Sequence, residues 1–268
     1  MDLQLTGSRV LVTGGTKGIG RAVVEAFADE GAAVEFCARD AGEIETAEKE
    51  LAGRGAGVRG VQLDVRDGAA LTSWVEAAAG RLGGIDAVVA NVSALAVPDT
   101  EENWYASFEV DLMHTVRLAK AALPHLEASG RGSIVALSSV TGREADFASG
   151  PYGTMKTAIV GYIAGLAFQL AGRGVRANVV SPGNTFFTGG IWDGIKQGSP
   201  DLYADSLALN PTGRMGLPAE MAKAVVFLSS PVSSFTTGTN LVVDGALTRG
   251  IQLCGGGRPD PPGGRSCP

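Results

Sequence analysis

Short apolar runs alternate with segments of helical length along most of this chain, and no other feature constrains its fold as strongly. The apolar runs lie at residues 10–12, 33–38, 58–63, 85–90, 133–137, 175–180 and 239–243. Parallel strands need crossover connections of this length, and such crossovers place helices on both faces of the sheet. The alternation therefore predicts an α/β fold, a doubly wound parallel sheet of about seven strands with ligands at the carboxyl ends of the strands.

The length of 268 residues allows one large domain, and the sequence shows neither an internal repeat nor a second domain. We expect a single domain over residues 1–253, followed by a Gly/Pro-rich tail at 254–268 that does not fold by itself. Residues 186–213 mix glycines with large apolar side chains. Such an insert at the ligand edge predicts a substrate lid, with a packed helical excursion as the alternative.

The charge balance excludes one class of partner. The chain has 28 acidic and 22 basic residues, and its net charge of −6 argues against binding to nucleic acid. We find no signal peptide and no apolar run of 18 residues, and therefore expect a cytoplasmic protein that does not enter a membrane. Cys37, Cys254 and Cys267 lack metal-site spacing and are expected to be reduced thiols; a Cys254–Cys267 disulfide is the alternative.

A glycine-rich segment follows the first predicted strand. It reads Thr13-Gly14-Gly15-Thr16-Lys17-Gly18-Ile19-Gly20, and a helical pattern begins at Arg21. A glycine loop between a strand and a helix lets the backbone approach a pyrophosphate, which the N–H groups of the helix can bind. The glycine spacing differs from G-x-G-x-x-G, so a turn without a binding role is the alternative.

The end of the second predicted strand indicates which dinucleotide the chain prefers. Sites that prefer NAD usually place a carboxylate there for the ribose 2′-hydroxyl, whereas sites that prefer NADP use a cation for the 2′-phosphate. Here Arg39 follows the strand and Lys17 lies in the glycine loop, which favours NADP(H) over NAD(H). We expect the neighbouring Asp40 to cap the next helix. The alternative is that both cations are ordinary surface charges.

Two more strands end in polar residues. Asp64, which precedes Val65, offers a loop carboxylate to an adenine amino group, and Asn91 and Ser93 follow the fourth strand. Parallel strands bring their carboxyl ends to one edge of the sheet, so we expect these residues near the glycine loop.

One helix is predicted to run through residues 104–123, opened by a capping box in which Asp99 is the cap. Pro124 is expected near the end of this long helical stretch, in which His114 and His125 lie eleven residues apart. A helical metal site would not use that spacing, so no metal is predicted.

Ser139, Tyr152 and Lys156 bring a hydroxyl, a phenol and an ammonium to the same edge. Ser139 follows the fifth strand, while Tyr152 and Lys156 lie four residues apart on one face of the next helix. An ammonium can stabilise an ionised phenol, and a hydroxyl can bind the oxygen that the phenol protonates. The set suits acid–base chemistry on a carbonyl or an alcohol. A plain amphipathic helix with a solvated lysine is the alternative.

Taken in order, these motifs resemble those of the classical short-chain dehydrogenase/reductase family over about residues 5–251, with a pattern closest to members that reduce 3-oxoacyl thioesters. The matching motifs are Thr13-Gly14-x-x-x-Gly18-x-Gly20, Asp64-Val65, Asn91, Ser139, Tyr152-x-x-x-Lys156, Pro182-Gly183 and Asp244-Gly245. The resemblance implies a Rossmann-type fold and hydride transfer with a nicotinamide cofactor. It also implies a homotetramer or dimer built through the helices at 104–128 and 152–171.

The resemblance further implies a role for each candidate residue. Tyr152 is the general acid in reduction and the base in oxidation, Lys156 stabilises the ionised phenol and holds the nicotinamide ribose, and Ser139 positions the substrate oxygen. The expected cofactor-binding residues are Gly14, Thr16, Lys17, Gly18, Ile19, Gly20, Arg39, Asp64, Val65, Asn91, Ser93, Tyr152, Lys156, Pro182, Gly183, Thr185 and Thr188. The expected substrate-lining residues are Leu95, Val97, Glu144, Phe147, Phe186, Phe187 and Trp192.

Three departures from the family pattern stand out. Val92-Ser93 follows Asn91 where the family usually has Ala-Gly, and Asp111 takes the helix position of a catalytic asparagine. Asp111 remains a catalytic candidate because a carboxylate can hold the water of a proton relay to Lys156; it can equally mark reduced or altered activity. The threonine expected to touch the cofactor carboxamide is shifted, so either Thr185 or Thr188 serves.

The leading hypothesis is an NADPH-dependent carbonyl reductase that acts on a 3-oxoacyl thioester or a related keto intermediate. One alternative is an NAD(P)-dependent alcohol dehydrogenase that works oxidatively. Another is a cofactor-binding protein with impaired catalysis, which Asp111 and Val92-Ser93 would explain.

Overall fold

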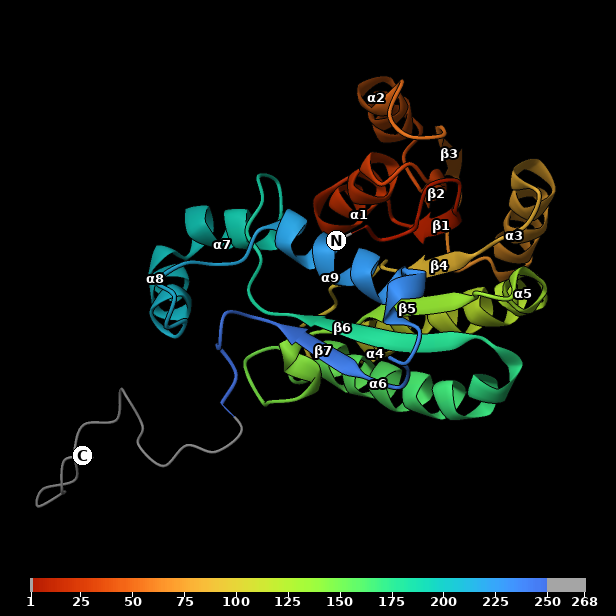
Figure 1. The fold of residues 1–268 in the computed structure, drawn as a ribbon. Helices are drawn as coiled ribbons and strands as arrows, with labels where there is room; N and C mark the ends of the chain where they lie inside the picture. The colour runs from red at the N-terminus through yellow and green to blue at the C-terminus, as the bar shows by residue number, and fades with distance from the viewer. Residues whose placement is uncertain (1, 250–268) are drawn as a thin grey trace, which may run out of the picture.

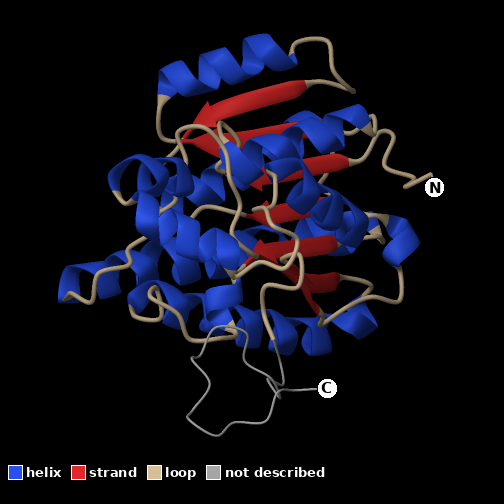
Figure 2. Cartoon of the chain, turned by 90° about the vertical axis from the view of Figure 1, so that its left-hand side faces the viewer, coloured by secondary structure: helices blue, strands red, loops and turns tan. Residues whose placement is uncertain are grey.

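The computed structural model describes residues 2–249, and their strands form one parallel sheet (Figure 1). The strands are β1 (Arg9–Thr13), β2 (Ala33–Ala38), β3 (Val58–Gln62), β4 (Ala87–Ala90), β5 (Ser133–Leu137), β6 (Arg176–Pro182) and β7 (Asn240–Val243). They lie in the order β3-β2-β1-β4-β5-β6-β7, and their arrows point the same way in Figure 2. The predicted doubly wound sheet of seven strands is confirmed. The tail at 254–268, with Cys254 and Cys267, lies outside the described residues.

Helices cover both faces of the sheet, as its apolar strands require. Helices α1 (Gly18–Asp29), α2 (Ala41–Leu51) and α9 (Pro218–Ser229) share one core cluster with the strands, and α3 (Gly68–Leu82), α5 (His114–Ser129) and α6 (Pro151–Leu170) share the other. Phe27 and Phe36 are fully buried in the first cluster, as Leu118 and Ile163 are in the second. Short 3₁₀ turns lie at η2 (Val140–Gly142), η3 (Ala171–Arg173) and η4 (Pro231–Ser233).

Side chains cap the N-termini of α2 and α4 (Glu101–Ser107), and the cap of α4 differs from the prediction. Asp40 caps α2 by accepting from the Glu43 N–H at 2.8 Å, as expected. The cap of α4 is Thr100, whose Oγ1 accepts from the Asn103 N–H at 3.3 Å. The prediction of Asp99 as this cap was wrong because its carboxylate binds the indole N–H of Trp104 at 2.8 Å.

The helix predicted through residues 104–123 is not continuous. Helix α4 passes into a π-helical turn, η1 (Phe108–Met113), before α5 begins. Pro124, expected near the end of the helix, lies inside α5. A π turn adds a residue to the helical repeat and is common at functional sites. Here η1 packs against α6 and carries Asp111, whose side chain is fully buried.

The predicted lid region contains two helices, α7 (Ile191–Gly198) and α8 (Pro200–Ala208), which lie beyond the carboxyl ends of the strands (Figure 1). Trp192 of α7 is 7% exposed, so this helix is anchored by a buried aromatic side chain.

The segment Pro151–Arg173 is long and apolar enough to cross a membrane by length and composition alone, although no such run was expected. Its buried residues Ile159 and Ile163 belong to the core beneath the sheet, and a core helix passes the same test. Cys37 is also buried, and burial raises the pKa of its thiol to about 12, so it stays protonated.

Candidate active site

A cavity of about 630 Å³ lies at the carboxyl edge of the sheet. It begins at the glycine loop after β1, passes the ends of β2 and β4, and reaches β5, α6 and α7. Strand β1 lies between β2 and β4, which is where the strand order reverses and where open α/β sheets bind ligands. Its volume falls within the range of roughly 300–1,000 Å³ that is usual for small-molecule sites.

The glycine loop leaves backbone exposed to the cavity because side chains would not fit. Gly14 has φ +73°, and a Cβ on Gly20 would lie 2.0 Å from the Gly14 carbonyl oxygen. Lys17 is the N-cap residue of α1, and no side chain among the described residues caps the start of this helix. The first N–H groups of α1 are therefore available to an anion. The bulk of Val92 is accommodated because its Cγ2 packs where Gly14 has no side chain.

Asn91 fastens β4 to the glycine loop. Its side-chain N–H donates to the Thr13 and Gly14 carbonyls at 3.0 and 3.2 Å, and its backbone N–H donates to Thr13 Oγ1 at 3.0 Å. The expected cofactor residue thus also holds the loop in shape. Nearby, Ser93 Oγ accepts from the Leu95 N–H at 3.1 Å.

The two cations expected to read the 2′-phosphate line the cavity, and so does a carboxylate that sequence did not indicate. Glu43 accepts from Thr16 Oγ1 at 2.8 Å and from Lys17 Nζ at 3.2 Å. The hydrogen bond from Thr16, with Lys17 beside it, lowers the pKa of Glu43. Asp64 is similarly engaged, because Arg66 binds its carboxylate with contacts as short as 2.6 Å.

Lys156 is 2% exposed, which contradicts the alternative of a solvated lysine. Its Nζ lies 3.0 Å from Asp111 Oδ1, donates to the Leu137 carbonyl at 3.1 Å, and stands 5.5 Å from the centroid of the Tyr152 ring. Helix α6 begins at Pro151, so Tyr152 and Lys156 fall on its first two turns at the cavity. The structure thus brings the predicted phenol and ammonium together.

The Asp111 carboxylate lies behind Lys156 rather than in the cavity lining. Its Oδ2 accepts from the Ala94 N–H at 3.2 Å, whereas Oδ1 faces the ammonium without hydrogen-bond alignment. Asp111 and Lys156 therefore form a direct ion pair. Both side chains are buried, at 0% and 3% exposure, so removing either charge would leave the other poorly solvated.

His114 belongs to the same buried layer. Its Nδ1 lies 2.6 Å from the Val110 carbonyl, so Nδ1 carries the proton and Nε2 accepts from Thr13 Oγ1 at 3.0 Å. Burial lowers the pKa of His114 to about 4. This neutral histidine connects η1 to the end of β1 and supports the layer behind the cavity.

Ser139 lies at the end of a short hydroxyl chain. Its Oγ donates to Thr141 Oγ1 at 3.3 Å, and Thr141 Oγ1 donates to Asp146 Oδ2 at 2.8 Å. All three line the cavity. Sequence pointed only to Ser139, because nothing in the loop at 143–150 distinguished Asp146 from a surface residue.

The structure places most of the predicted residues in the cavity lining. From the glycine loop, the strand ends and the catalytic set these are Gly14, Thr16, Lys17, Gly18, Ile19, Gly20, Arg39, Asp64, Val65, Asn91, Ser93, Ser139, Tyr152, Lys156, Pro182, Gly183 and Thr185. From the expected substrate residues these are Leu95, Val97, Phe147, Phe187 and Trp192. Phe187 also lies against Gly18, where its ring would meet any added Cβ at 2.6 Å.

Besides Asp111, three predicted residues do not reach the cavity. Thr188 is exposed in the loop before α7, and Glu144 lies outside the lining. Phe186 turns toward Tyr203, with ring centroids 6.2 Å apart, on the far side of its loop. Further lining residues that sequence did not indicate include Glu43, Arg66, Thr141, Asp146, Asn184 and Ile195. Of these residues, only Glu43 could have been found from the sequence. It is a carboxylate on the first turn of the helix that follows Arg39.

These features fit a nicotinamide dinucleotide. The glycine loop offers backbone N–H groups for the pyrophosphate, and the Tyr152–Lys156 pair lies at the other end of the cavity, beyond Asn91. Within residues 2–249, no cluster of three or more His, Cys, Asp or Glu side chains is arranged to hold a metal ion.

Comparisons with known proteins agree with this geometry. A family model described as enoyl-(acyl carrier protein) reductase matches residues 14–248. Isoepoxydon dehydrogenase of Penicillium expansum is 40% identical over 254 residues, covering 93% of this chain and 98% of the relative. L-fucose dehydrogenase of Bos taurus is 34% identical, with 93% of each chain covered.

Two further similarities extend this picture. The 3-oxoacyl-[acyl-carrier-protein] reductase FabG of Vibrio cholerae is 31% identical over 91% of this chain and 99% of its own. The crystal structure of gox2181 superposes with a TM-score of 0.85 at 29% identity, covering 92% of this chain and 97% of that one.

Proposed function

The chain belongs to the short-chain dehydrogenase/reductase family, and from this premise we propose that it is an NADPH-dependent carbonyl reductase that converts a ketone into a secondary alcohol. The family acts on CH–OH and C=O groups with a nicotinamide cofactor. The observation that carries the proposal is the burial of Lys156 between Asp111 and the Tyr152 ring at the cavity.

In this proposal Tyr152 gives its phenolic proton to the substrate oxygen during reduction and removes it during oxidation. Ser139 turns its hydroxyl from Thr141 to the same oxygen and stabilises the charge that develops there. A bound nicotinamide supplies or accepts the hydride. Lys156 stabilises the ionised phenol once Tyr152 has given up its proton.

Asp111 acts in this proposal as a positioning residue. A lysine ammonium has three N–H donors. The Leu137 carbonyl accepts from one of them, and Asp111 lies 3.0 Å from the ammonium as its ion-pair partner, which leaves at least one donor for the Tyr152 phenol or a ribose hydroxyl. By holding the ammonium from behind, Asp111 directs a free donor into the cavity.

The preference for NADP(H) is supported by Lys17 and Arg39, which follow β1 and β2 respectively and both line the cavity. Because Lys17 and Arg39 line the same cavity, the alternative that they are ordinary surface charges is disfavoured. Thr185 remains the better of the two candidates for the carboxamide, because it lines the cavity and Thr188 does not.

The substrate half of the cavity supports a ketone with apolar surroundings. Phe147 and Trp192 meet edge to face with centroids 6.2 Å apart, and Leu95 and Val97 lie on the same lining. The similarity to FabG supports a 3-oxoacyl thioester or a related keto intermediate. The second candidate is oxidation of an alcohol, which the similarity to isoepoxydon dehydrogenase and L-fucose dehydrogenase favours.

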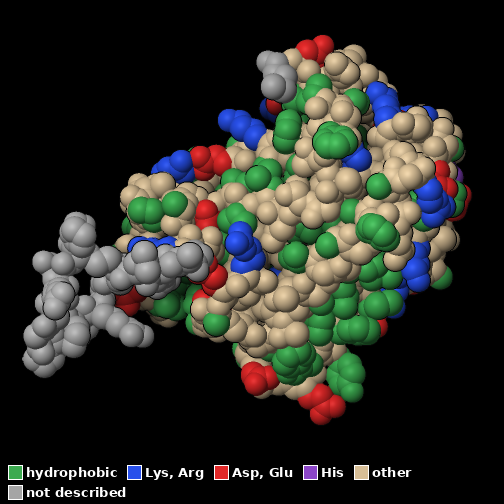
Figure 3. All heavy atoms as spheres, turned by 60° about the horizontal axis from the view of Figure 1, so that its bottom comes forward, with side chains coloured by type: hydrophobic (Ala, Val, Ile, Leu, Met, Phe, Trp, Pro, Cys, Tyr) green, Lys and Arg blue, Asp and Glu red, His purple; other side chains and the backbone are tan. Residues whose placement is uncertain are grey.

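Self-association through the α4–α5 and α6 region is supported by large apolar side chains at the surface. Tyr105 is 65% exposed and Phe168 is 89% exposed. Figure 3, which brings the underside of the molecule forward, shows hydrophobic side chains distributed over that face. We propose a homotetramer or dimer that works in the cytoplasm, and light scattering of the purified protein measures its mass.

Tyr152→Phe, with Tyr162→Phe as the matched control on the same helix, tests the catalytic proposal. We expect kcat/KM for ketone reduction to fall about 10²- to 10⁴-fold in the first variant and to change little in the second. Initial rates with NADPH and a ketone panel, and with NADP⁺ and the matching alcohols, compare the two directions. Wild-type protein that binds NADPH without turning over any substrate would instead support the alternative of impaired catalysis.

A further inference from the structure

Glu43 makes contacts that bear directly on which dinucleotide the cavity accepts. We propose that Glu43 is a specificity-determining residue whose carboxylate competes with the 2′-phosphate of NADP(H) for Thr16 and Lys17. The consequence is weak discrimination between NADPH and NADH. This inference rests on the proposed function, because it presumes that a dinucleotide occupies the cavity.

The competition follows from the contacts of the Glu43 carboxylate. Its two oxygens bind Thr16 Oγ1 at 2.8 Å and Lys17 Nζ at 3.2 Å. A hydroxyl and an ammonium are also the donors that a phosphate monoester would use. The carboxylate therefore occupies, within the chain itself, the place of an anionic ligand.

The local charges point the same way. Lys17, Arg39 and Arg66 are the three cations that line this end of the cavity. Glu43 pairs with Lys17 and Asp64 pairs with Arg66, whereas Arg39 has no ion pair with any described residue. One unpaired cation remains for a doubly charged phosphate, which would also face the negative charge of Glu43.

The same carboxylate suits the ribose of NADH. A carboxylate near the end of the second strand is the acceptor that a 2′-hydroxyl needs. The side chains of Glu43 and Lys17 are 42% and 69% exposed, so their ion pair is weak and a phosphate can displace it. Glu43 thus opposes NADPH binding without excluding it.

The test compares two nucleotides that differ only in the 2′-phosphate, 2′,5′-ADP and 5′-AMP, by titration calorimetry. Glu43→Gln keeps the side-chain size and removes the charge. Glu45→Gln is the matched control, because Glu45 lies on the same helix and pairs with Lys49 outside the cavity. Binding is measured without turnover, so an effect on catalysis cannot imitate the result.

We expect Glu43→Gln to strengthen 2′,5′-ADP binding about tenfold and to leave 5′-AMP binding unchanged or slightly weaker, with no change in Glu45→Gln. The NADPH/NADH ratio of kcat/KM should rise in parallel. An unchanged affinity ratio in Glu43→Gln, with both nucleotides still binding, would overturn this inference alone. Failure of wild-type protein to bind either nucleotide or either dinucleotide would overturn the proposed function as well.

Discussion

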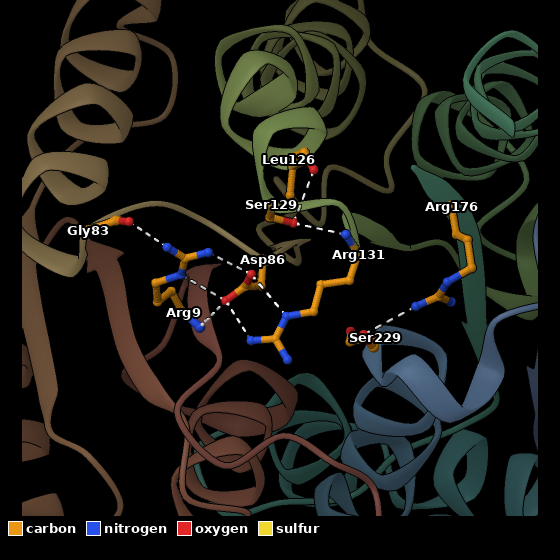
Figure 4. A network of polar contacts seen from close by, with 8 residues as sticks. All are labelled: Arg9, Gly83, Asp86, Leu126, Ser129, Arg131, Arg176 and Ser229. Atoms are coloured by element: carbon orange, nitrogen blue, oxygen red, sulfur yellow. Dashed lines mark hydrogen bonds and ion pairs between the residues drawn. The ribbon is translucent and has the colours of Figure 1, made fainter. Parts of the chain in front are cut away.

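A buried carboxylate with cationic partners lies near each end of strands β1, β4 and β5, and the two ends differ in how completely these charges are satisfied. At the amino edge, Asp86 lies between Arg9 and Arg131 (Figure 4). Its carboxylate accepts five hydrogen bonds of 2.8 to 3.2 Å from these two residues. Beside this cluster, Arg176 donates to the carbonyls at the end of α9, including that of Ser229 at 3.2 Å.

At the carboxyl edge, the buried pair of Lys156 and Asp111 is less complete. Asp111 Oδ1 faces the ammonium without an aligned hydrogen bond, and at least one lysine donor remains free to face the cavity. At the amino edge, which we call the closed edge, both oxygens of the Asp86 carboxylate are fully hydrogen-bonded within the chain. The carboxyl edge, which we call the open edge, keeps lysine N–H donors available to a ligand, as a binding site requires.

The largest expected effect is the loss of stability when the closed edge is broken. Asp86→Asn leaves two arginines without their carboxylate, and we expect the free energy of unfolding to fall by about 3 kcal/mol. Urea denaturation measures this change, and kcat/KM of the folded protein should stay the same. Asp29→Asn, which removes an exposed pair with Arg54, is the control and should cost less than about 1 kcal/mol. An equal loss in both variants would contradict the contrast between the edges.

Acid should weaken the carboxyl edge before the amino edge. Burial holds the pKa of His114 at about 4, against 6.5 in the unfolded chain, so the unfolded chain binds the extra proton and stability falls between pH 6.5 and 4. Burial also opposes ionisation of Asp86, yet hydrogen bonds from Arg9 and Arg131 hold its pKa at about 2. Its contribution is complete above pH 4 and is lost as the pH falls toward 2. The His114 step is worth about 3 kcal/mol and the Asp86 step about 2 kcal/mol.

Urea midpoints between pH 7 and pH 2 would resolve these two steps. The charged groups that act on His114 are those of Asp111, Lys156 and Arg117. All three are left unchanged in the two histidine variants below. His114→Asn should remove the step above pH 4, whereas His125→Asn, beside Glu76, should not. A single transition below pH 4 in the wild type would mean that the amino edge fails first.

A smaller effect is expected when the open edge is altered. Asp111→Asn keeps an oxygen for the Ala94 N–H but removes the charge behind Lys156, so we expect kcat/KM to fall about tenfold, equivalent to about 1.4 kcal/mol. Asp111→Ala should lose more. The control is Glu109→Gln on the same π turn, which pairs with Arg117. An unchanged pH profile and rate in Asp111→Asn would show that Asp111 serves packing alone.

The smallest effect should come from removing one of the two arginines at the closed edge. Arg131→Met removes one of the two arginines, but Arg9 keeps its contacts of 2.8 Å with Asp86. Since the Arg131 side chain is 39% exposed, we expect a loss of no more than about 1 kcal/mol in urea denaturation. A loss as large as that of Asp86→Asn would show that the two arginines act as one unit.

Strand alternation was sufficient to predict the parallel sheet, because strands buried on both faces must be apolar and their crossovers must be helical. It also predicted that Gly14, Asn91 and Ser139 would share one edge, since all three lie within two residues of the end of a strand. The four-residue spacing of Tyr152 and Lys156 placed both on one helical face. These are local regularities, and residues close in sequence determine them.

Contacts between distant segments decided the rest. The local sequence did not predict the π turn at η1. Its packing against α6 brings the Asp111 carboxylate to Lys156. The pairing of Glu43 with Lys17 depends on how α2 lies beside the glycine loop. In both cases a charge takes its role from its partner across the fold, and only the tertiary structure supplies that partner.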